Sequence, residues 1–264
     1  MDLGLKEKII LITGGAGSRG SIGETIVKAL AQEGAIPVIL DRNDRGHEYA
    51  RELNEAGTDA TFYQLDLTSA DSIKEAVTSA IEKYGRIDAV INNVGVNDGV
   101  GLDASPEEFM HSLKLNMVSY FLTVKYALPK LKESKGSILN VGSKVAVTGQ
   151  GGTSGYAASK GGVLALTREW AVDLINDGIR VNALMIAECF TPAYDNWLKT
   201  LANPEDKLNA ITSKIPLGRR MTTTNEIADT VLFLISGRSS HTTGQYVFVD
   251  GGYVHLDRAL LTEN

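Results

Sequence analysis

The amino-acid sequence predicts an α/β fold built around a parallel sheet. Short runs rich in β-branched and apolar residues alternate with longer stretches of helical periodicity, a pattern typical of βαβ units. Most of the short runs are continuously apolar, as expected of strands that are covered on both faces. No proline- or serine-rich linker, charge block or internal repeat interrupts the alternation. We therefore expect one domain over residues 1–264.

The expected elements follow one another in a regular order. The apolar, β-rich runs predict strands at residues 8–13, 36–41, 61–65, 89–92, 137–141, 180–185 and 245–249. Helical periodicity predicts helices at residues 22–34, 44–57, 70–84, 106–133, 155–176 and 225–236. A glycine follows four of these helices, where a left-handed residue commonly ends a helix: Gly34, Gly57, Gly85 and Gly178.

Residues 187–217 break the periodic pattern. This segment contains three prolines and Trp197. An irregular insertion of this kind beside a sheet edge is usually a lid or a substrate-facing flap, and the alternative is that it only fills space against the domain.

The composition excludes several classes of protein. The chain of 264 residues is 43% hydrophobic and 22% charged, which is incompatible with a disordered, collagen-like or coiled-coil chain. Its net charge of −6, without a run of Lys or Arg, argues against nucleic acid or an anionic membrane surface as the main partner.

The cysteine and histidine content argues against a metal protein. The single Cys189 can form neither an intrachain disulfide nor a multi-cysteine zinc site, and it favours a reducing compartment. The four histidines show no metal-binding spacing. The N-terminus lacks a basic signal-peptide region, and no apolar stretch approaches the roughly 20 residues of a membrane span. We expect a soluble cytoplasmic protein.

A glycine-rich turn follows the first strand and precedes the first helix. Glycines at this place let backbone N–H groups at a helix N-terminus approach a diphosphate closely. The second strand ends in Asp41, 18 residues after Gly23, near the spacing of an acid that binds the adenosine ribose. Its carboxylate would repel a 2′-phosphate, so NAD is favoured, although Arg42 and Arg19 leave NADP open.

Two further strand ends belong to the same predicted cofactor site. Asp66 and Leu67 follow the third strand, where the adenine ring would lie; Asp66 could equally form a helix-capping motif with Thr68. The fourth strand ends in small and polar residues that include Asn93 and Gly95. Ligands of open parallel sheets bind at these carboxyl ends.

Ser143, Tyr156 and Lys160 form a candidate catalytic group. Tyr156 and Lys160 are four residues apart, so a helix places them on one face. Lowering the pKa of a phenol from about 10 to about 7 requires about 4 kcal/mol, which a cation about 4 Å away can supply at an effective dielectric constant of about 20. The alternative is an ordinary surface pair.

The order and spacing of these motifs resemble the short-chain dehydrogenase/reductase family over almost the full chain. The resemblance rests on the glycine-rich turn, the Asn-Asn-Val-Gly tract that begins at Asn92, Asn116, and the Ser143, Tyr156 and Lys160 group. It implies a single Rossmann-type domain: a doubly wound parallel sheet of seven strands flanked by helices. It also implies a homotetramer built through the helices near 106–133 and 155–176.

The resemblance implies a role for each catalytic residue. Tyr156 would be the general acid/base, and Lys160 would anchor the nicotinamide ribose and lower the pKa of the phenol. Ser143 would orient the substrate oxygen, and Asn116 would hold a water molecule of a proton relay. No metal is required.

Three departures from the family pattern affect the expected cofactor contacts. The turn has three extra residues between its first and last glycine, and we expect Gly14, Ser18, Ile22 and Gly23 to hold the diphosphate. The usual Pro-Gly after the sixth strand is replaced by Ile186-Ala187, although Thr191 still falls where a nicotinamide contact is expected. Val94 replaces an alanine and adds bulk near the ribose.

The substrate prediction rests on the flap. Glu188 could accept hydrogen bonds from a polyhydroxylated substrate, or it could simply face solvent. Trp197 is expected to face the same substrate. Residues 187–192, 217–222 and 250–258 resemble the L-fucose dehydrogenase branch of the family. That branch implies oxidation of an anomeric hydroxyl to a lactone with hydride transfer to NAD⁺.

Two alternative functions remain open from the sequence. One is an NADPH-dependent 3-oxoacyl-carrier reductase, or another alcohol dehydrogenase of the family, with the same catalytic residues. The other is a catalytically silent NAD-binding sensor, which would keep the fold without catalysis.

Overall fold

The strands of the computed structural model, which describes residues 2–257, form one parallel sheet of seven strands. Their order across the sheet is β3-β2-β1-β4-β5-β6-β7. The bounds are β1 Ile9–Thr13, β2 Ile36–Asp41, β3 Thr61–Gln64, β4 Ala89–Asn92, β5 Ser137–Ser143, β6 Arg180–Ile186 and β7 Tyr246–Val249. The strand order reverses between β1 and β4, which places the ligand crevice of such a sheet at their carboxyl ends.

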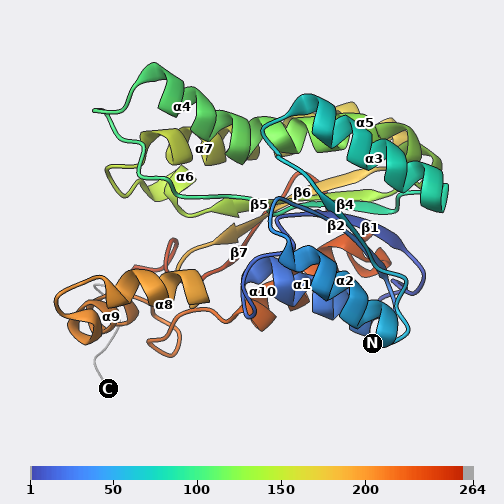
Figure 1. The fold of residues 1–264 in the computed structure, drawn as a ribbon. Coiled ribbons are helices and arrows are strands. Elements are labelled where there is room, and N and C mark those ends of the chain that lie inside the picture. The colour runs from blue at the N-terminus through green and yellow to red at the C-terminus, as the bar shows by residue number, and fades with distance from the viewer. Residues whose placement is uncertain (1, 258–264) are drawn as a thin grey trace.

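Helices cover both faces of the sheet, so the predicted doubly wound α/β fold is confirmed. Figure 1 shows α3, α4, α5, α6 and α7 on one face and α1, α2 and α10 on the other. The bounds are α1 Ile22–Gln32, α2 Arg45–Glu55, α3 Ala70–Tyr84, α4 Pro106–Leu113, α5 Ser119–Ser134, α6 Val145–Thr148, α7 Ser154–Asp173, α8 Pro192–Lys199, α9 Pro204–Thr212 and α10 Thr224–Ile235. Among the described residues, no helix combines the length and apolar character that crossing a bilayer requires.

The first strand shows why the strand sequences are continuously apolar. Ile10 and Ile12 pack in the core with α1 and α10, whereas Ile9 and Leu11 pack in the core with α3, α5 and α7. All four side chains are buried. Because successive residues of a strand point to opposite faces, a sheet covered on both sides needs apolar residues at every position.

The four glycines predicted to end helices have the left-handed conformation. Their φ angles are positive at Gly34, Gly57, Gly85 and Gly178. The strand predictions are accurate to within one or two residues. β5 and β6 are longer than expected and reach Ser143 and Ile186, respectively.

Two segments differ from the sequence prediction. The helix expected over residues 106–133 is interrupted by a π-helical turn, Lys114–Val118, which contains Asn116. A π turn adds one residue to the helix but keeps the 3.6-residue period on either side of it, so the period alone does not reveal the turn. The irregular segment at 187–217 contains the short helices α8 and α9, each with proline at its first position. Proline is well tolerated there because that residue has no intrahelical N–H bond to lose. The last residue of the tract 250–258, Arg258, lies outside the described residues.

Candidate active site

The glycine-rich turn between β1 and α1 is closed so tightly that two of its glycines cannot be replaced. Gly14 has a φ of +70°, and a Cβ atom there would lie 2.8 Å from the Cα atom of Val94. A Cβ atom at Gly23 would lie 2.0 Å from the carbonyl oxygen of Gly14. Neither position can carry a side chain, so the backbone near the start of α1 can approach a bound diphosphate closely.

A cavity of about 600 Å³ lies at this turn and along the carboxyl ends of β1, β2 and β4. Nine residues predicted to bind the cofactor line it: Gly14, Ile22, Gly23, Asp41, Asp66, Leu67, Asn93, Gly95 and Thr191. Ser18, Tyr156 and Lys160, which were also predicted to bind the cofactor, do not line the cavity, whereas Gly17 and Ser21 do. The cavity therefore fits a dinucleotide, although the turn presents different residues to it than the sequence suggested.

Sequence reasoning missed several lining residues. Leu65, Thr68 and Val96 lie in the strand-end loops next to predicted residues and could have been included, whereas Arg42 and Val94 had already been expected near the cofactor. His111, Leu115 and Ala193 also line the cavity. They lie in α4, the π turn and α8, and only the folded arrangement brings them to the site.

Asp41 is held at the mouth of the cavity by the backbone. Its Oδ2 atom accepts a hydrogen bond from the N–H of Ala16 at 2.8 Å, and its Oδ1 atom accepts one from the N–H of Asn43 at 3.0 Å. These bonds fix the carboxylate next to the glycine-rich turn. Each oxygen retains lone-pair capacity for a ribose hydroxyl.

Arg19 is engaged outside the cavity. Its guanidinium donates to Glu48 at 2.7 Å, is paired with Glu52, and stacks over the ring of Tyr49. The hydroxyl of Tyr49 in turn donates to the carbonyl of Gly17. The extra residues of the turn are thus fastened to α2 by an arginine whose charge already faces two carboxylates.

Asp66 and Asn93 organise the loops on either side of the turn. Asp66 accepts hydrogen bonds from the N–H and the hydroxyl of Thr68, and these bonds lower the pKa of its carboxyl group. Asp66 thus forms a local turn with Thr68, while the N-cap of α3 is Ser69, and Asp66 also lines the cavity. The side-chain amide of Asn93 donates to the carbonyls of Gly14 and Thr13, which ties the end of β4 to the turn.

Asn116 is buried in the π turn and fixes the backbone of the loop after β4. Its Oδ1 atom accepts from the N–H of Val96 at 2.8 Å, and its Nδ2 atom donates to the carbonyls of Val96 and Ser112. A π turn inside a helix is often found at functional sites. Here it lies directly beside residues that line the cavity.

Ser143, Tyr156 and Lys160 come together as the sequence predicted. Ser143 is the last residue of β5, and Tyr156 lies in the first turn of α7. Hydrogen bonding to Ser143 lowers the pKa of Tyr156, but burial has the larger effect and raises it. The Nζ atom of Lys160 lies 5.7 Å from the centre of the Tyr156 ring. The sequence-based expectation that Lys160 lowers the pKa of Tyr156 did not take the burial of the phenol into account.

Lys160 is fully buried, and burial lowers its pKa to about 7. Its ammonium group donates to the backbone carbonyl of Val141 at 2.8 Å and to the hydroxyl of Tyr120 at 3.0 Å. Both partners are uncharged oxygens. Near neutral pH, small changes around Lys160 therefore shift the balance between its ammonium and free-amine forms.

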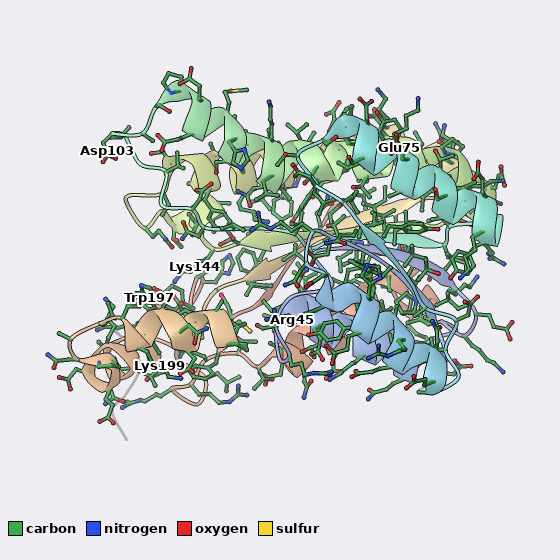
Figure 2. All side chains as sticks on the ribbon, in the orientation of Figure 1. Arg45, Glu75, Asp103, Lys144, Trp197 and Lys199 are labelled. Atoms are coloured by element: carbon green, nitrogen blue, oxygen red, sulfur yellow. The ribbon has the colours of Figure 1, made fainter. Side chains whose placement is uncertain are left out.

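A polar cluster lies next to Ser143. Glu188 forms an ion pair with Lys144, and its second oxygen accepts from the hydroxyl of Tyr194 at 2.9 Å. Only 11% of the Lys144 side chain and 13% of the Glu188 side chain are exposed, so the alternative of a solvent-facing glutamate is wrong. The ring of Trp197 packs edge-on against that of Tyr194, with 5.2 Å between the ring centres. Figure 2 shows Lys144 between the upper helices and α8, on the side where Trp197 lies.

The comparisons with known proteins agree with this geometry. The family model described as "Enoyl-(Acyl carrier protein) reductase" matches residues 15–254. The 3-oxoacyl-(acyl-carrier-protein) reductase FabG of Thermotoga maritima is 35% identical over 95% of this chain and 99% of its own length. The L-fucose dehydrogenase of Bos taurus is 34% identical over 93% of this chain and 88% of its own length.

Solved structures with the same fold include proteins crystallised with either dinucleotide. The Cj0485 dehydrogenase is 43% identical over the whole of both chains, with a TM-score of 0.94. The L-sorbose reductase of Gluconobacter frateurii, complexed with NADPH and L-sorbose, is 26% identical over 97% of this chain and 100% of its own, with a TM-score of 0.92. An NAD⁺-bound xylitol dehydrogenase is 28% identical over 94% of this chain and 99% of its own, with a TM-score of 0.86.

Proposed function

Since this chain belongs to the short-chain dehydrogenase/reductase family, and is thus an oxidoreductase acting on CH–OH groups, we propose that it oxidises the anomeric hydroxyl of a sugar to the lactone. L-Fucose or a related aldose is the substrate that we favour, with NAD⁺ as the cofactor. The similarity to an L-fucose dehydrogenase supports this choice.

The polar cluster next to Ser143 is the observation that carries the proposal. Lys144, Glu188 and Tyr194 present charged and hydroxyl groups where the substrate would lie. Sugar hydroxyls can exchange hydrogen bonds with such groups, whereas an acyl chain cannot. A polyhydroxylated substrate therefore suits this polar cluster better than a fatty-acyl chain.

The chemistry proposed for the catalytic residues takes the roles that the family resemblance implies for them. Ser143 would orient the substrate hydroxyl, and the Tyr156 phenolate would accept its proton as the C1–H bond breaks and the carbonyl forms. Bound NAD⁺ supplies the acceptor for the hydride that leaves C1. Lys160 would lower the pKa of Tyr156 and bind the nicotinamide ribose, and Asn116 would hold the water molecule of the proton relay.

Two features support NAD over NADP. Asp41 is fixed by two backbone N–H groups beside the turn, where it would accept ribose hydroxyls and repel a 2′-phosphate. Arg19, the arginine of the turn, already faces Glu48 and Glu52. Arg42 also lines the cavity, and NADP is the alternative cofactor.

A 3-oxoacyl-carrier reductase is the second candidate. The 35% identity to the Thermotoga maritima enzyme favours it. The two functions are separated by initial rates with L-fucose, L-galactose, D-arabinose, D-glucose and an acetoacetyl thioester, each with both nicotinamide cofactors. Oxidation of one of the sugars with NAD⁺ supports the proposal. Activity confined to the thioester with NADPH would refute it.

The Tyr156→Phe variant distinguishes an enzyme from a silent NAD-binding protein. Loss of the general acid/base should reduce turnover of the best substrate by about 10²–10⁴-fold while NADH binding, followed by fluorescence, is retained. Tyr246→Phe is the control, because it removes a phenol-to-carbonyl hydrogen bond at Leu164 in the same helix. Full turnover in Tyr156→Phe would refute the proposed acid/base role of this residue, whereas NADH binding without turnover in the wild-type protein would support the silent binding protein.

We also propose that the protein is a homotetramer. Exposed apolar side chains on and next to the long helices support this assembly: Phe121 on α5, Val172 on α7 and Ile175 just after α7. Light scattering should give a mass four times that of the 28.3 kDa chain.

A further inference from the structure

The catalytic group contains a second tyrosine that sequence reasoning did not identify. Tyr120 lies in α5 and has no exposed surface. Its hydroxyl is 3.0 Å from the Nζ atom of Lys160, and the ammonium lies 4.9 Å from the centre of its ring. Lys160 thus lies between two tyrosines, Tyr156 on its own helix and Tyr120 on the neighbouring one.

The direction of the hydrogen bonds at Tyr120 is fixed by its surroundings. Its hydroxyl donates to the carbonyl of Val94 at 2.8 Å, and an ammonium group can only donate. The Tyr120 oxygen therefore accepts a hydrogen bond from the Lys160 ammonium. This arrangement links the lysine to the loop after β4, which lines the cofactor cavity.

The groups around the ammonium provide little other stabilisation for its charge. Tyr156 faces it from α7, the Val141 carbonyl from β5, and Asn116, an uncharged side chain, lies near it beside Gly95. Within residues 2–257, no carboxylate forms a hydrogen bond or ion pair with Lys160. A buried ammonium without a counter-ion depends on the few oxygens and ring faces that it contacts.

We propose that Tyr120 is a positioning residue for Lys160, whose hydroxyl and ring hold the lysine in its charged form within reach of Tyr156. Removing the hydroxyl would leave the ammonium with one fewer acceptor in a buried site, which shifts it toward the free amine. A less charged lysine would stabilise the Tyr156 phenolate less. This role rests on the proposed function of Tyr156, but it requires no particular substrate.

The test is a direct titration of Tyr156 in the enzyme saturated with NAD⁺. Phenolate formation is followed by ultraviolet absorbance, and the curve of the matching Tyr156→Phe protein is subtracted to remove the other tyrosines. We expect the midpoint to rise by about one pH unit in Tyr120→Phe, which corresponds to a tenfold change in the ionisation constant. Because no substrate is present, this result is independent of whether the enzyme oxidises L-fucose.

Tyr246→Phe is the matched control for the titration. Its hydroxyl donates to the carbonyl of Leu164, one turn beyond Lys160 in α7, so the variant loses a similar bond without touching the lysine. We expect no shift of the Tyr156 midpoint in this variant. An unchanged midpoint in Tyr120→Phe, or an equal shift in both variants, would overturn the proposal.

A crystal structure of the wild-type NAD⁺ complex provides a second test, which requires no variant. The proposal requires the Lys160 Nζ and Tyr120 hydroxyl oxygen to remain within about 3.2 Å in the complex. A lysine that leaves Tyr120 when the cofactor binds would disprove it.

Discussion

Lys144 and Glu188 form an ion pair beside Ser143. The Glu188 carboxylate also accepts a hydrogen bond from the hydroxyl of Tyr194. Both charged side chains are largely buried. Such a pair gains little net stability over apolar side chains, because each charge loses its hydration. The position of this ion pair in the polar cluster, where the substrate is expected to lie, is better explained by selection of a polar substrate than by stability.

Glu188→Gln should therefore affect substrate binding more than turnover. The amide keeps the shape of the side chain but removes the charge that holds Lys144, so we expect KM for the preferred sugar to rise about 10-fold or more and kcat to change less. Steady-state kinetics measure both. Glu226→Gln is the control, because its ion pair with Arg220 lies at the surface. Equal effects of the two substitutions would contradict a role in substrate selection.

Asp41→Asn should weaken the preference for NAD. The amide can still accept from the N–H of Ala16, but it no longer repels a 2′-phosphate. We expect the ratio of kcat/KM with NADP⁺ to kcat/KM with NAD⁺ to increase at least about tenfold, or about 1.4 kcal/mol. Asp44→Asn removes the same charge from an exposed residue that does not line the cavity. A ratio that moves as much in Asp44→Asn would show only a general effect of charge.

Gly23→Ala should abolish dinucleotide binding. The new Cβ atom would lie 2.0 Å from the carbonyl oxygen of Gly14, so the turn must open to accept it. NADH fluorescence titration should show no saturation, and the melting temperature should fall. Gly237→Ala places a Cβ atom in open space and should leave both quantities nearly unchanged. Normal NADH affinity in Gly23→Ala would show that the turn is not the diphosphate site.

The sequence was sufficient to predict the sheet and nine of the residues that line the cavity. Strands covered on both faces are continuously apolar, and the residues that follow parallel strands meet at one edge whatever the details of packing. Asp41 could therefore be placed at this edge from its position at the end of β2, and Asn93 and Gly95 from their positions after β4. Ser18 could not, because the course of an extended turn depends on contacts such as that of Arg19 with α2.

The catalytic environment was harder to predict for a related reason. Tyr120 lies on a different helix from Lys160, 40 positions earlier in the chain, and no periodic pattern in the sequence indicates that the two are in contact. Glu188 was expected to be either solvent-facing or substrate-facing, and its pairing with Lys144 joins two loops that are distant in sequence. The effect of burial on the pKa values of Tyr156 and Lys160 is also a property of the folded packing.

The burial of Lys160 predicts that the lysine destabilises the protein in the absence of cofactor. Its pKa is about 7 in the folded chain and 10.5 ordinarily, so between these values the unfolded chain binds more protons. The free energy of unfolding should therefore rise with pH across this window. The cost of burying the charge is fully present below about pH 7 and vanishes near 10.5. The raised pKa values of buried Tyr120 and Tyr156 act in the opposite direction only above about pH 10.

Lys160→Met should consequently be more stable than the wild-type apoprotein at pH 6.5. The shift sets an upper bound of about 5 kcal/mol, from which the two lost hydrogen bonds remove about 1 kcal/mol each. We expect a melting temperature several degrees higher at pH 6.5 and a smaller difference at pH 9.5, measured by calorimetry. Lys74→Met, at an exposed position in α3, should show neither effect. A Lys160→Met protein that is less stable at pH 6.5 would mean that Tyr120 and Val141 compensate the buried charge completely.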